Sequence, residues 1–202
     1  MSKTTEVKYQ DGTRPLTPDE VSQLVQWVGK ARTTNAYTYQ TAIQFNVKIG
    51  LRVNELEKLK IEDLYTEGIC DGTLIVYQSK TKSKRTVKIP TKIQDMMTAY
   101  YVKEKLYKRD VTSPVFGFKQ QAFRKVLRET NQRYLGFEDF STHSLRKTFA
   151  NDLYNYYETK AKQTPMQAIT SVQGVLGHSN PKITEIYLAK DITKNTYDPD
   201  DF

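Results

Sequence analysis

The stretch LGHSNPKITEIY, residues 176–187, places one of the two histidines of the chain nine residues before a tyrosine. Local rules predict a helix junction here. Gly177 is the residue type that ends a helix, because glycine adopts the left-handed conformation without steric cost. The asparagine and proline that follow predict an N-cap and a first helical position, so a second helix begins at once. His178 would therefore lie in a tight link, with Tyr187 about two turns into the next helix.

Capping patterns predict where three other helices begin. A threonine, a proline and an acid or amide form a capping box at Thr17–Glu20 and again at Thr164–Gln167. Thr91, just after a proline, begins a third helix that we expect to run towards Leu106. Apolar residues at helical spacing indicate further helical stretches at Tyr37–Ile49, Val53–Leu59, Phe118–Leu135 and Thr142 to about Tyr157.

One segment has the pattern of β-strands. Residues 73–78 (TLIVYQ) are rich in β-branched and aromatic side chains, residues 85–89 (RTVKI) alternate basic and apolar ones, and SKTKSK links them. This predicts an antiparallel hairpin, extended to a third strand by the segment around Ile69. We therefore expect a mainly α fold with one small antiparallel β-sheet, in the α+β class.

The expected domain covers residues 17–190. Residues 1–16 would be a lead-in and residues 191–202 an acidic tail, because neither end has enough apolar residues to fold alone.

The composition favours a polyanionic partner. The formal net charge is +8 although the chain ends in the acidic sequence DPDDF, so the body is more basic than the total. A basic protein gains affinity for nucleic acid because neutralised phosphates release condensed counterions. No apolar run is long enough to span a bilayer, and MSKTTEVKYQ has no signal-peptide core. Cys70 is the single cysteine, too few for an internal disulfide or a zinc site. We expect a cytoplasmic protein in a reduced compartment.

Four short motifs collect side chains that can bind a phosphate. They are GLRVNEL at residues 50–56, SKTKSKR at 79–85, HSLRKTF at 143–149 and the opening stretch. Their polar residues are Arg52, Glu55, Lys80, Arg85, His143, Arg146, His178 and Tyr187. Both histidines of the chain fall inside the set, which chance would rarely arrange. Taken singly each residue is ordinary: Arg52 and Glu55 would form a surface ion pair, and Tyr187 is one of fourteen tyrosines.

In their order and spacing these motifs resemble the catalytic domain of the tyrosine recombinases, the phage-integrase family. The resemblance runs from about residue 17 to residue 190 and implies that family's fold. It implies a site-specific recombinase that cleaves and rejoins double-stranded DNA through a 3′-phosphotyrosyl intermediate, without metal or cofactor. Integration, excision, inversion and resolution stay open, as does the place of the chain in a mobile element. The implied partners are a DNA recombination site, a homotetramer on that DNA and accessory DNA-bending proteins, with no membrane and with the nucleoid as location.

The resemblance assigns the bond-breaking roles to two residues. Tyr187 would be the nucleophile, because its ester with phosphate conserves the bond energy for a second strand. Lys80, in the hairpin turn, would be the general acid that protonates the leaving 5′ oxygen.

The other residues of the set would support the phosphate. Arg52 and Arg146 would stabilise the non-bridging oxygens, because a guanidinium stays charged and its planar fork matches phosphate. His143 and His178 would hydrogen-bond the phosphate, and His143 would assist proton movement at the tyrosine. Glu55 would support the site without touching the substrate.

Basic residues outside this set are candidates for DNA contact. The stretch 118–135 carries several of them against a single acid, Glu129. We interpret it as a helix presented to the major groove; the alternative is a solvated face. With the hairpin residues, the candidate DNA-binding set is Lys82, Lys84, Arg85, Lys119, Arg124, Lys125 and Arg128.

Two other functions stay open. A type IB topoisomerase shares the arginines, the lysine, the second histidine and the tyrosine, but usually has lysine where His143 stands. A catalytically silent DNA-binding regulator would be free to lose one site residue, whereas this sequence keeps them all.

Two regions depart from the usual pattern of the family. Most members have a separate N-terminal domain that closes on the DNA. This chain is therefore either a naturally short member, similar in layout to the fimbrial-switch recombinases, or a piece of a longer protein. The segment after the tyrosine often docks on a neighbouring protomer in the family, and here Leu188 and Ile192 are the expected contacts.

Overall fold

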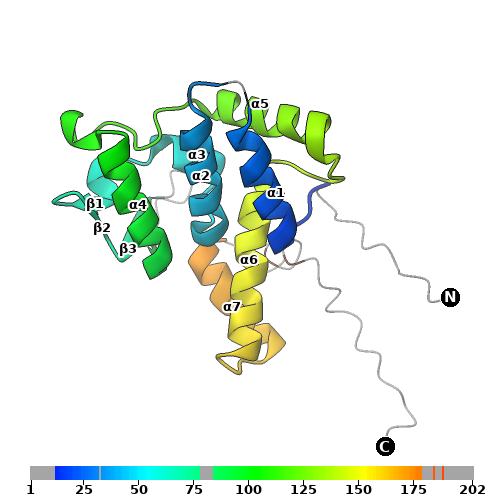
Figure 1. Ribbon diagram of the computed structural model, residues 1–202. Coiled ribbons are helices and arrows are strands. Elements are labelled where there is room, and N and C mark those ends of the chain that lie inside the picture. Colours follow the sequence, from blue (N-terminus) through cyan, green and yellow to red (C-terminus); the bar gives the residue numbers. More distant parts are fainter. Residues whose placement is uncertain (1–11, 32, 78–83, 179–183, 185–187, 189–202) are drawn as a thin grey trace, which may run out of the picture.

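The computed structural model describes residues 12–31, 33–77, 84–178, 184 and 188 of the 202. Seven α-helices lie within this part of the chain (Figure 1). They are α1 (Pro18–Gly29), α2 (Ala36–Ile49), α3 (Val53–Lys58), α4 (Thr91–Lys103), α5 (Gln120–Thr130), α6 (Thr142–Thr159) and α7 (Pro165–Leu176). The strands are β1 (Tyr65–Thr66), β2 (Ile69–Cys70), β3 (Thr73–Tyr77) and β4 (Lys84–Lys88). The predicted mainly α fold with a small antiparallel sheet is confirmed, apart from the strand pairing given below.

Both predicted capping boxes are confirmed. The Thr17 backbone N–H donates to Glu20 at 2.9 Å, and the Glu20 N–H donates back to the Thr17 hydroxyl at 3.2 Å. Thr164 and Gln167 make the same reciprocal pair at the start of α7. Each pair satisfies two N–H groups that a helix leaves without an internal partner, so each fixes where its helix begins.

One predicted helix ends earlier than expected, and another reaches its predicted end in a different helix type. α4 stops at Lys103, because Lys105 adopts a left-handed φ of 53°, and Leu106 lies in a separate 3-10 turn, Leu106–Lys108. α5 stops at Thr130 and continues as a π-helical turn, Asn131–Leu135. In that turn Tyr134 stacks on Trp27 of α1 with the ring centroids 4.5 Å apart.

The strands form two separate two-stranded antiparallel sheets. β3 pairs with β4, with Val76 opposite Arg85, and alternate residues of both strands face inward. The prediction that the segment around Ile69 joins this hairpin as a third strand is wrong. β2 pairs with β1 instead, because Glu67 and Gly68 both adopt positive φ and reverse the chain in two residues.

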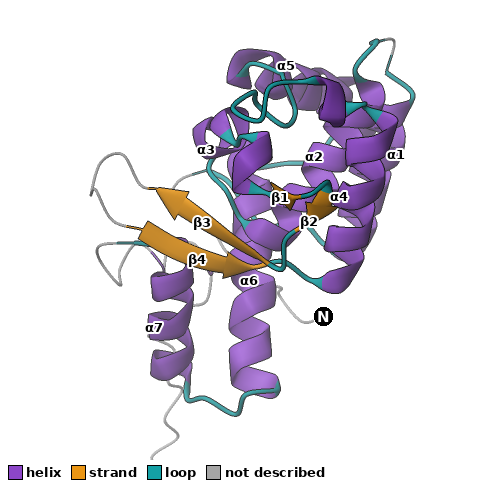
Figure 2. Cartoon of the chain, turned by 90° about the vertical axis from the view of Figure 1, so that its left-hand side faces the viewer, coloured by secondary structure: helices purple, strands orange, loops and turns teal. Residues whose placement is uncertain are grey.

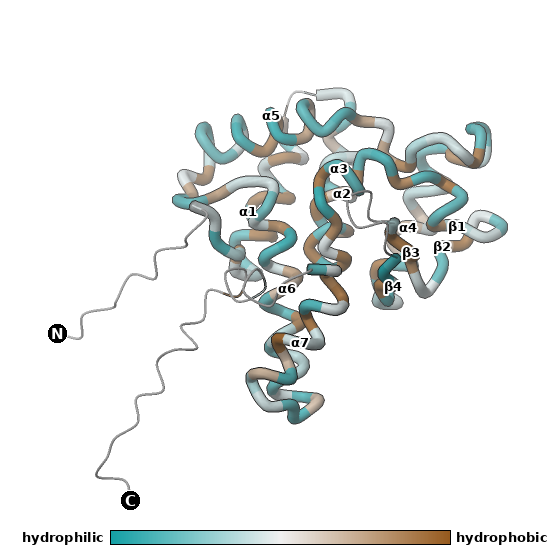
Figure 3. Tube along the Cα trace, turned by 180° about the vertical axis from the view of Figure 1, so that it is seen from behind, coloured by the Kyte–Doolittle hydropathy of each residue, from teal (hydrophilic) through white to brown (hydrophobic). Residues whose placement is uncertain are grey.

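α2 lies at the centre of the molecule and packs against α1, α4 and α6, while α7 packs against α6 and β4. Apolar residues concentrate along α2 and β3, whereas α5 is mainly hydrophilic (Figure 3). α5 lies across one end of the molecule, and α6 and α7 form an antiparallel hairpin that extends from the opposite end (Figures 1 and 2). None of the described helices is long and apolar enough to cross a membrane.

The last residues of the lead-in pack onto α6. Leu16 is buried and its N–H donates to the Thr148 hydroxyl at 2.8 Å. The fully buried Lys147 donates from Nζ to the Thr13 carbonyl at 2.6 Å. These bonds attach the lead-in to the helical turn that carries Arg146.

Leu188 also belongs to the interior of its own chain. Its exposed fraction is 2%. The prediction that Leu188 contacts a neighbouring protomer therefore does not match its placement, and Ile192 lies outside the described residues.

Gly50 is predicted to tolerate substitution poorly. It ends α2 with a left-handed φ of 69°, and an added Cβ would lie 2.2 Å from Cδ1 of Phe149 on α6. Gly50→Ala should lower the free energy of unfolding by about 2–4 kcal/mol, since backbone strain and overpacking both contribute. Chemical denaturation measures this.

Gly136 provides the matched control for backbone strain. Its φ is 64°, but an added Cβ would meet nothing within 4 Å. Gly136→Ala should therefore cost only about 1–2 kcal/mol, the strain alone. Equal losses in the two variants would show that the packing of Phe149 against Gly50 contributes nothing.

Candidate active site

Glu55 lies at the centre of a group of arginines. Arg52 is the N-cap residue of α3, its N–H donates to Oε2 of Glu55 at 2.8 Å, and its Nη1 donates to Oε1 at 3.1 Å. About a third of the Arg52 side chain is exposed, against 11% of Glu55. The predicted neighbours Arg52 and Glu55 thus form an ion pair that is half-buried at the start of α3.

Arg85 joins the same carboxylate from the hairpin. It occupies an inward position of β4, its Nη2 donates to Oε2 of Glu55 at 2.8 Å, and its Nη1 donates to the Val175 carbonyl at 3.0 Å. Its side chain is 3% exposed. The prediction of a DNA contact for Arg85 does not match this placement, because the guanidinium ties β4 to α3 and α7 inside the protein.

Arg146 holds the ends of two helices together. It is 1% exposed, its Nη1 donates to the Gly50 carbonyl, and its Nη2 donates to the Leu176 carbonyl at 2.8 Å. Those carbonyls belong to the C-terminal ends of α2 and α7, where helix dipoles favour a cation. Nη1 also lies 3.9 Å from Oε2 of Glu55, so three guanidinium groups share one carboxylate.

His178 lies directly beside Arg146. Gly177 ends α7 with a φ of 64°, as predicted, and His178 follows in the link. The His178 N–H donates to the Gln173 carbonyl at 3.1 Å, and the Gln173 side-chain amide donates to the His178 carbonyl at 3.1 Å. The buried ring has Nε2 at 3.3 Å from Nη2 of Arg146 and Nδ1 at 3.0 Å from the Thr184 hydroxyl.

Burial and the arginines act together on the ionisable groups. Burial alone would raise the pKa of Glu55, but Arg85, the Arg52 N–H and Arg146 outweigh it, so the pKa lies below its usual value. Burial, followed by the charges of the same three arginines, lowers the pKa of His178 to about 3. At neutral pH the site therefore holds an ionised carboxylate and an uncharged imidazole.

His143 belongs to a neighbouring pocket. Ser141 caps α6 and accepts a hydrogen bond from the His143 N–H at 3.1 Å, and the His143 side chain is exposed. A pocket of about 340 Å³ lies between α5 and the start of α6. It is lined by Arg124, Leu127, Arg128, Phe140, Ser141, Thr142 and His143. Two of the predicted DNA-binding residues therefore share a pocket with His143.

The remaining candidates lie on the surface or outside the described residues. Lys84 is exposed, with Nζ 5.0 Å from the centre of the Tyr77 ring. Lys119 is 86% exposed and 3.6 Å from Glu57, and Lys125 lies 3.9 Å from Glu129 one turn along α5. The predicted residues that lie outside the described part are Lys80, Lys82 and Tyr187.

The sequence did not single out Thr184 or the carbonyls that hold the arginines. Main-chain oxygens carry no sequence signal, because every residue has one. Thr184 does have a recognisable position, six residues after His178 and three before Tyr187.

Comparison with known proteins places this geometry in a family. A sequence model described as the phage integrase family matches residues 14–194, so the chain belongs to that family. It is 29% identical over 164 residues to the probable integrase/recombinase YoeC of Bacillus subtilis, covering 76% of this chain and 79% of that protein. It is 26% identical over 180 residues to the tyrosine recombinase XerD of Staphylococcus aureus, covering 85% of this chain but only 56% of XerD.

The fold agrees with a solved structure of the same kind. The XerH site-specific recombinase, bound to its palindromic difH substrate in a post-cleavage complex, superposes with a TM-score of 0.64. The match covers 89% of this chain and 50% of XerH at 22% identity. At that identity the likeness establishes the fold.

Proposed function

We propose that the chain is the catalytic part of a site-specific DNA recombinase that breaks and rejoins double-stranded DNA through a phosphotyrosyl link. The observation that carries the proposal is the arginine cluster itself. Three guanidinium groups face one carboxylate, with an uncharged histidine against Arg146. Such an excess of fixed positive charge suits a phosphodiester, whose negative charge increases as a nucleophile attacks.

The three arginines differ in solvent exposure, and we assign their roles accordingly. Arg52 is the one that solvent reaches, so it is placed to meet the non-bridging oxygens of a bound phosphate first. Arg146 lies beneath it, and Arg85 serves as a support that keeps Glu55 and α7 in position. Because main-chain carbonyls and Glu55 fix these groups in advance, little reorganisation is needed as charge develops on the phosphate.

The chemical steps follow from the residue types. The Tyr187 oxygen attacks phosphorus and forms a bond to it, so the phosphate stays attached to the 3′ side of the DNA. The bond between phosphorus and the 5′ oxygen breaks at the same time. Lys80 gives its proton to that departing oxygen. In this proposal His143, which is exposed at the start of α6, exchanges protons at the tyrosine, and His178 supports the phosphate beside Arg146. Religation runs these steps in reverse with a different 5′ hydroxyl.

Covalent capture followed by peptide mapping tests this proposal. The protein is incubated with nicked duplexes prepared from its source DNA, and material that survives SDS is digested and analysed by mass spectrometry. A nucleotide attached to the peptide that contains Tyr187 supports the mechanism. Attachment to another of the fourteen tyrosines, or no adduct from protein that binds the duplexes, contradicts it.

Covalent capture, together with assays of supercoil relaxation and of strand exchange between paired sites, separates the two other functions. A silent regulator binds the duplexes and forms no adduct. A type IB topoisomerase forms an adduct and relaxes supercoiled DNA with no requirement for a second site. A recombinase exchanges strands only between paired sites, and we infer that it does so as a tetramer with the help of DNA-bending proteins.

We also propose that α5 lies against the DNA. Arg124 and Arg128 project from it into the pocket that His143 lines, so this helix and the site share one surface. Replacing both arginines with alanine should weaken DNA binding and lower the slope of log affinity against log salt by about 2, because two phosphate contacts are lost. Filter binding over a range of salt concentrations measures the slope.

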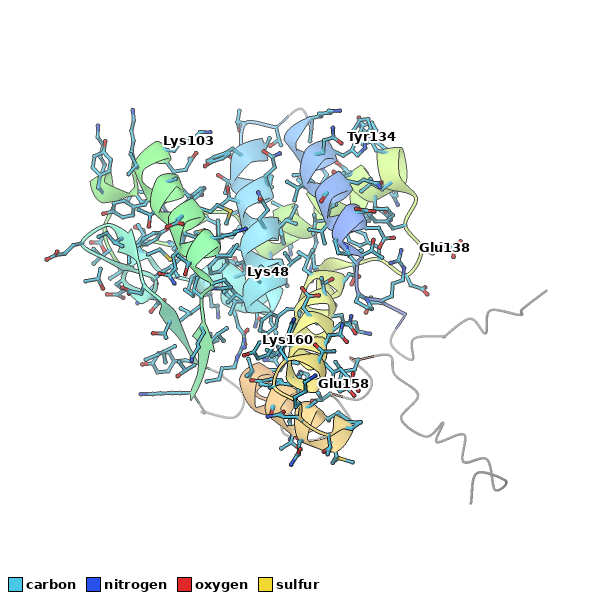
Figure 4. The ribbon with its side chains drawn as sticks, turned by 60° about the horizontal axis from the view of Figure 1, so that its bottom comes forward. Lys48, Lys103, Tyr134, Glu138, Glu158 and Lys160 are labelled. Atoms are coloured by element: carbon cyan, nitrogen blue, oxygen red, sulfur yellow. The ribbon has the colours of Figure 1, made fainter. Side chains whose placement is uncertain are left out.

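A matched pair of lysines provides the control. Lys160 and Lys162 are exposed in the loop that follows α6. That loop lies at the opposite end of the molecule from α5 (Figure 1), and Lys160 is labelled in Figure 4. Replacing both removes the same charge and should leave the slope unchanged. If the two double variants behave alike, net charge alone governs binding and α5 has no special place on the DNA.

A further inference from the structure

A chain of three polar groups runs from Arg146 through His178 to Thr184. Nη2 of Arg146 lies 3.3 Å from Nε2 of His178, and Nδ1 of the same ring lies 3.0 Å from the Thr184 hydroxyl. All three residues are buried, with Thr184 fully so. Thr184 lies within the opening stretch, residues 176–187, but is not one of the predicted site residues, and its hydroxyl contacts the histidine of the cluster directly.

The chemistry of the guanidinium determines which way these bonds point. A guanidinium carries only N–H donors, so Nε2 of His178 can interact favourably with Arg146 only through its lone pair. A second N–H at Nε2 would place donor against donor inside the protein. The ring proton is therefore on Nδ1, and the Thr184 oxygen accepts it.

The position of the proton on the His178 ring matters because the ring carries only one. Burial and the three arginines keep the imidazole uncharged at neutral pH, so its two nitrogens differ in role. In water the two tautomers of a histidine are close in energy. The donors of Arg146 disfavour a proton on Nε2 and the Thr184 oxygen favours one on Nδ1, so the two contacts together select the tautomer.

We propose that Thr184 is a positioning residue that holds His178 in the tautomer with the proton on Nδ1 and the Nε2 lone pair towards Arg146. Its effect on catalysis rests on the proposed function, whereas the tautomer is a property of the protein without DNA.

Nitrogen-15 NMR of the histidine rings tests the tautomer. Labelling histidine alone gives signals from only two residues, His143 and His178, and the exposed His143 serves as the internal reference. Long-range nitrogen–proton correlations distinguish a protonated from an unprotonated ring nitrogen. In the wild-type protein at neutral pH we expect His178 to show a protonated Nδ1 and an unprotonated Nε2. A protonated Nε2 in the wild type would overturn the proposal without any variant.

Two substitutions then test the role of the hydroxyl. Thr184→Val keeps the branched shape and removes the hydrogen bond, so the His178 signals should move towards a mixture of tautomers while those of His143 stay in place. Thr184→Ser keeps the hydroxyl and should preserve the wild-type pattern. An unchanged His178 pattern in Thr184→Val would show that the threonine fills space and does not select the tautomer.

Covalent capture with the same variants connects the tautomer to function. Thr184→Val should slow capture about tenfold, the equivalent of one lost hydrogen bond in the transition state, with Thr184→Ser close to wild type and DNA affinity unchanged in both. Equal rates for all three proteins would overturn the positioning role. If no protein forms an adduct, the proposed function fails, while the NMR result still decides the tautomer.

Discussion

Arg146→Lys is expected to slow strand cleavage by about 10³-fold while DNA affinity changes little. The Arg146 guanidinium reaches the Gly50 carbonyl, the Leu176 carbonyl and His178 at the same time. A lysine keeps the charge but concentrates it on one nitrogen, which cannot make these contacts in one plane and still face a phosphate. The transition state loses an aligned pair of donors, whereas attraction to the DNA backbone depends mainly on total charge. Single-turnover cleavage of a nicked duplex, at saturating protein, measures the effect.

Arg109 is the matched control for this substitution. Its two Nη atoms also donate to main-chain carbonyls, those of Pro114 and Val115, in the segment after α4. Arg109→Lys should therefore disturb local structure to a similar degree and leave cleavage at the wild-type rate. A loss of less than tenfold in Arg146→Lys, or an equal loss in Arg109→Lys, would show that the carbonyl contacts alone explain the effect.

Glu55→Gln is expected to lower the free energy of unfolding by about 3–5 kcal/mol. The substitution keeps the shape of the side chain and removes the only acid within 4 Å of Arg85 and Arg146 among the described residues. Both guanidinium groups are almost fully buried, so each would lose the negative charge of Glu55 in a place that water does not reach. Urea denaturation of the two proteins gives the difference directly.

Glu57→Gln, two residues along α3, is the control variant. It removes the same charge from an ion pair whose other partner is exposed. Glu57 pairs with Lys119 at 3.6 Å, but the Lys119 side chain is 86% exposed. An ion pair with one partner in water contributes only about 0–1 kcal/mol, so this variant should be close to wild type. Similar losses in the two variants would contradict a special role for the Glu55 cluster.

Acid should destabilise the protein through the same cluster. The folded-state pKa of Glu55 is lowered, so its contribution is fully present above the unfolded pKa of about 4.3 and disappears as the pH falls through the folded value. His178 acts in the same direction. Its folded pKa is about 3, so the unfolded chain binds the extra proton first as the pH falls below about 6.5. Glu55→Gln should remove the first effect and keep the second, which a denaturation series from pH 7 to pH 3 would reveal.

The sequence predicts local structure here better than it predicts burial. Capping boxes at Thr17 and Thr164 gave correct helix starts, because each depends on residues three apart in the chain. The third strand was wrong because the turn at Gly68 lets β2 pair locally with β1, and periodicity does not reveal which partner a two-residue strand takes. Helix ends were also less accurate than starts, since Lys105 carries no sign of its left-handed conformation.

The sequence likewise predicted some groups of the candidate site and missed others. Motif spacing identified Arg52, Arg146 and His178, and the structure brings them together around Glu55. The sequence pattern did not reveal that Arg85 is buried, because its inward position depends on the register of β4 against β3. The contacts of the Gly50 and Leu176 carbonyls could not be predicted from the sequence either, since they depend on where two helices end in space.

The antiparallel hairpin of α6 and α7 also has an evolutionary consequence. Arg146 lies near the start of α6 and His178 just after the end of α7, so both lie at one end of the hairpin and its loop at the other, about 20 Å away. Insertions or deletions between Lys160 and Thr164 can accumulate there, because they shift neither helix along its axis. One residue added inside either helix would turn everything beyond it by about 100° and separate the two side chains. Lineages of this sequence should therefore vary in length at the loop and keep the helices constant.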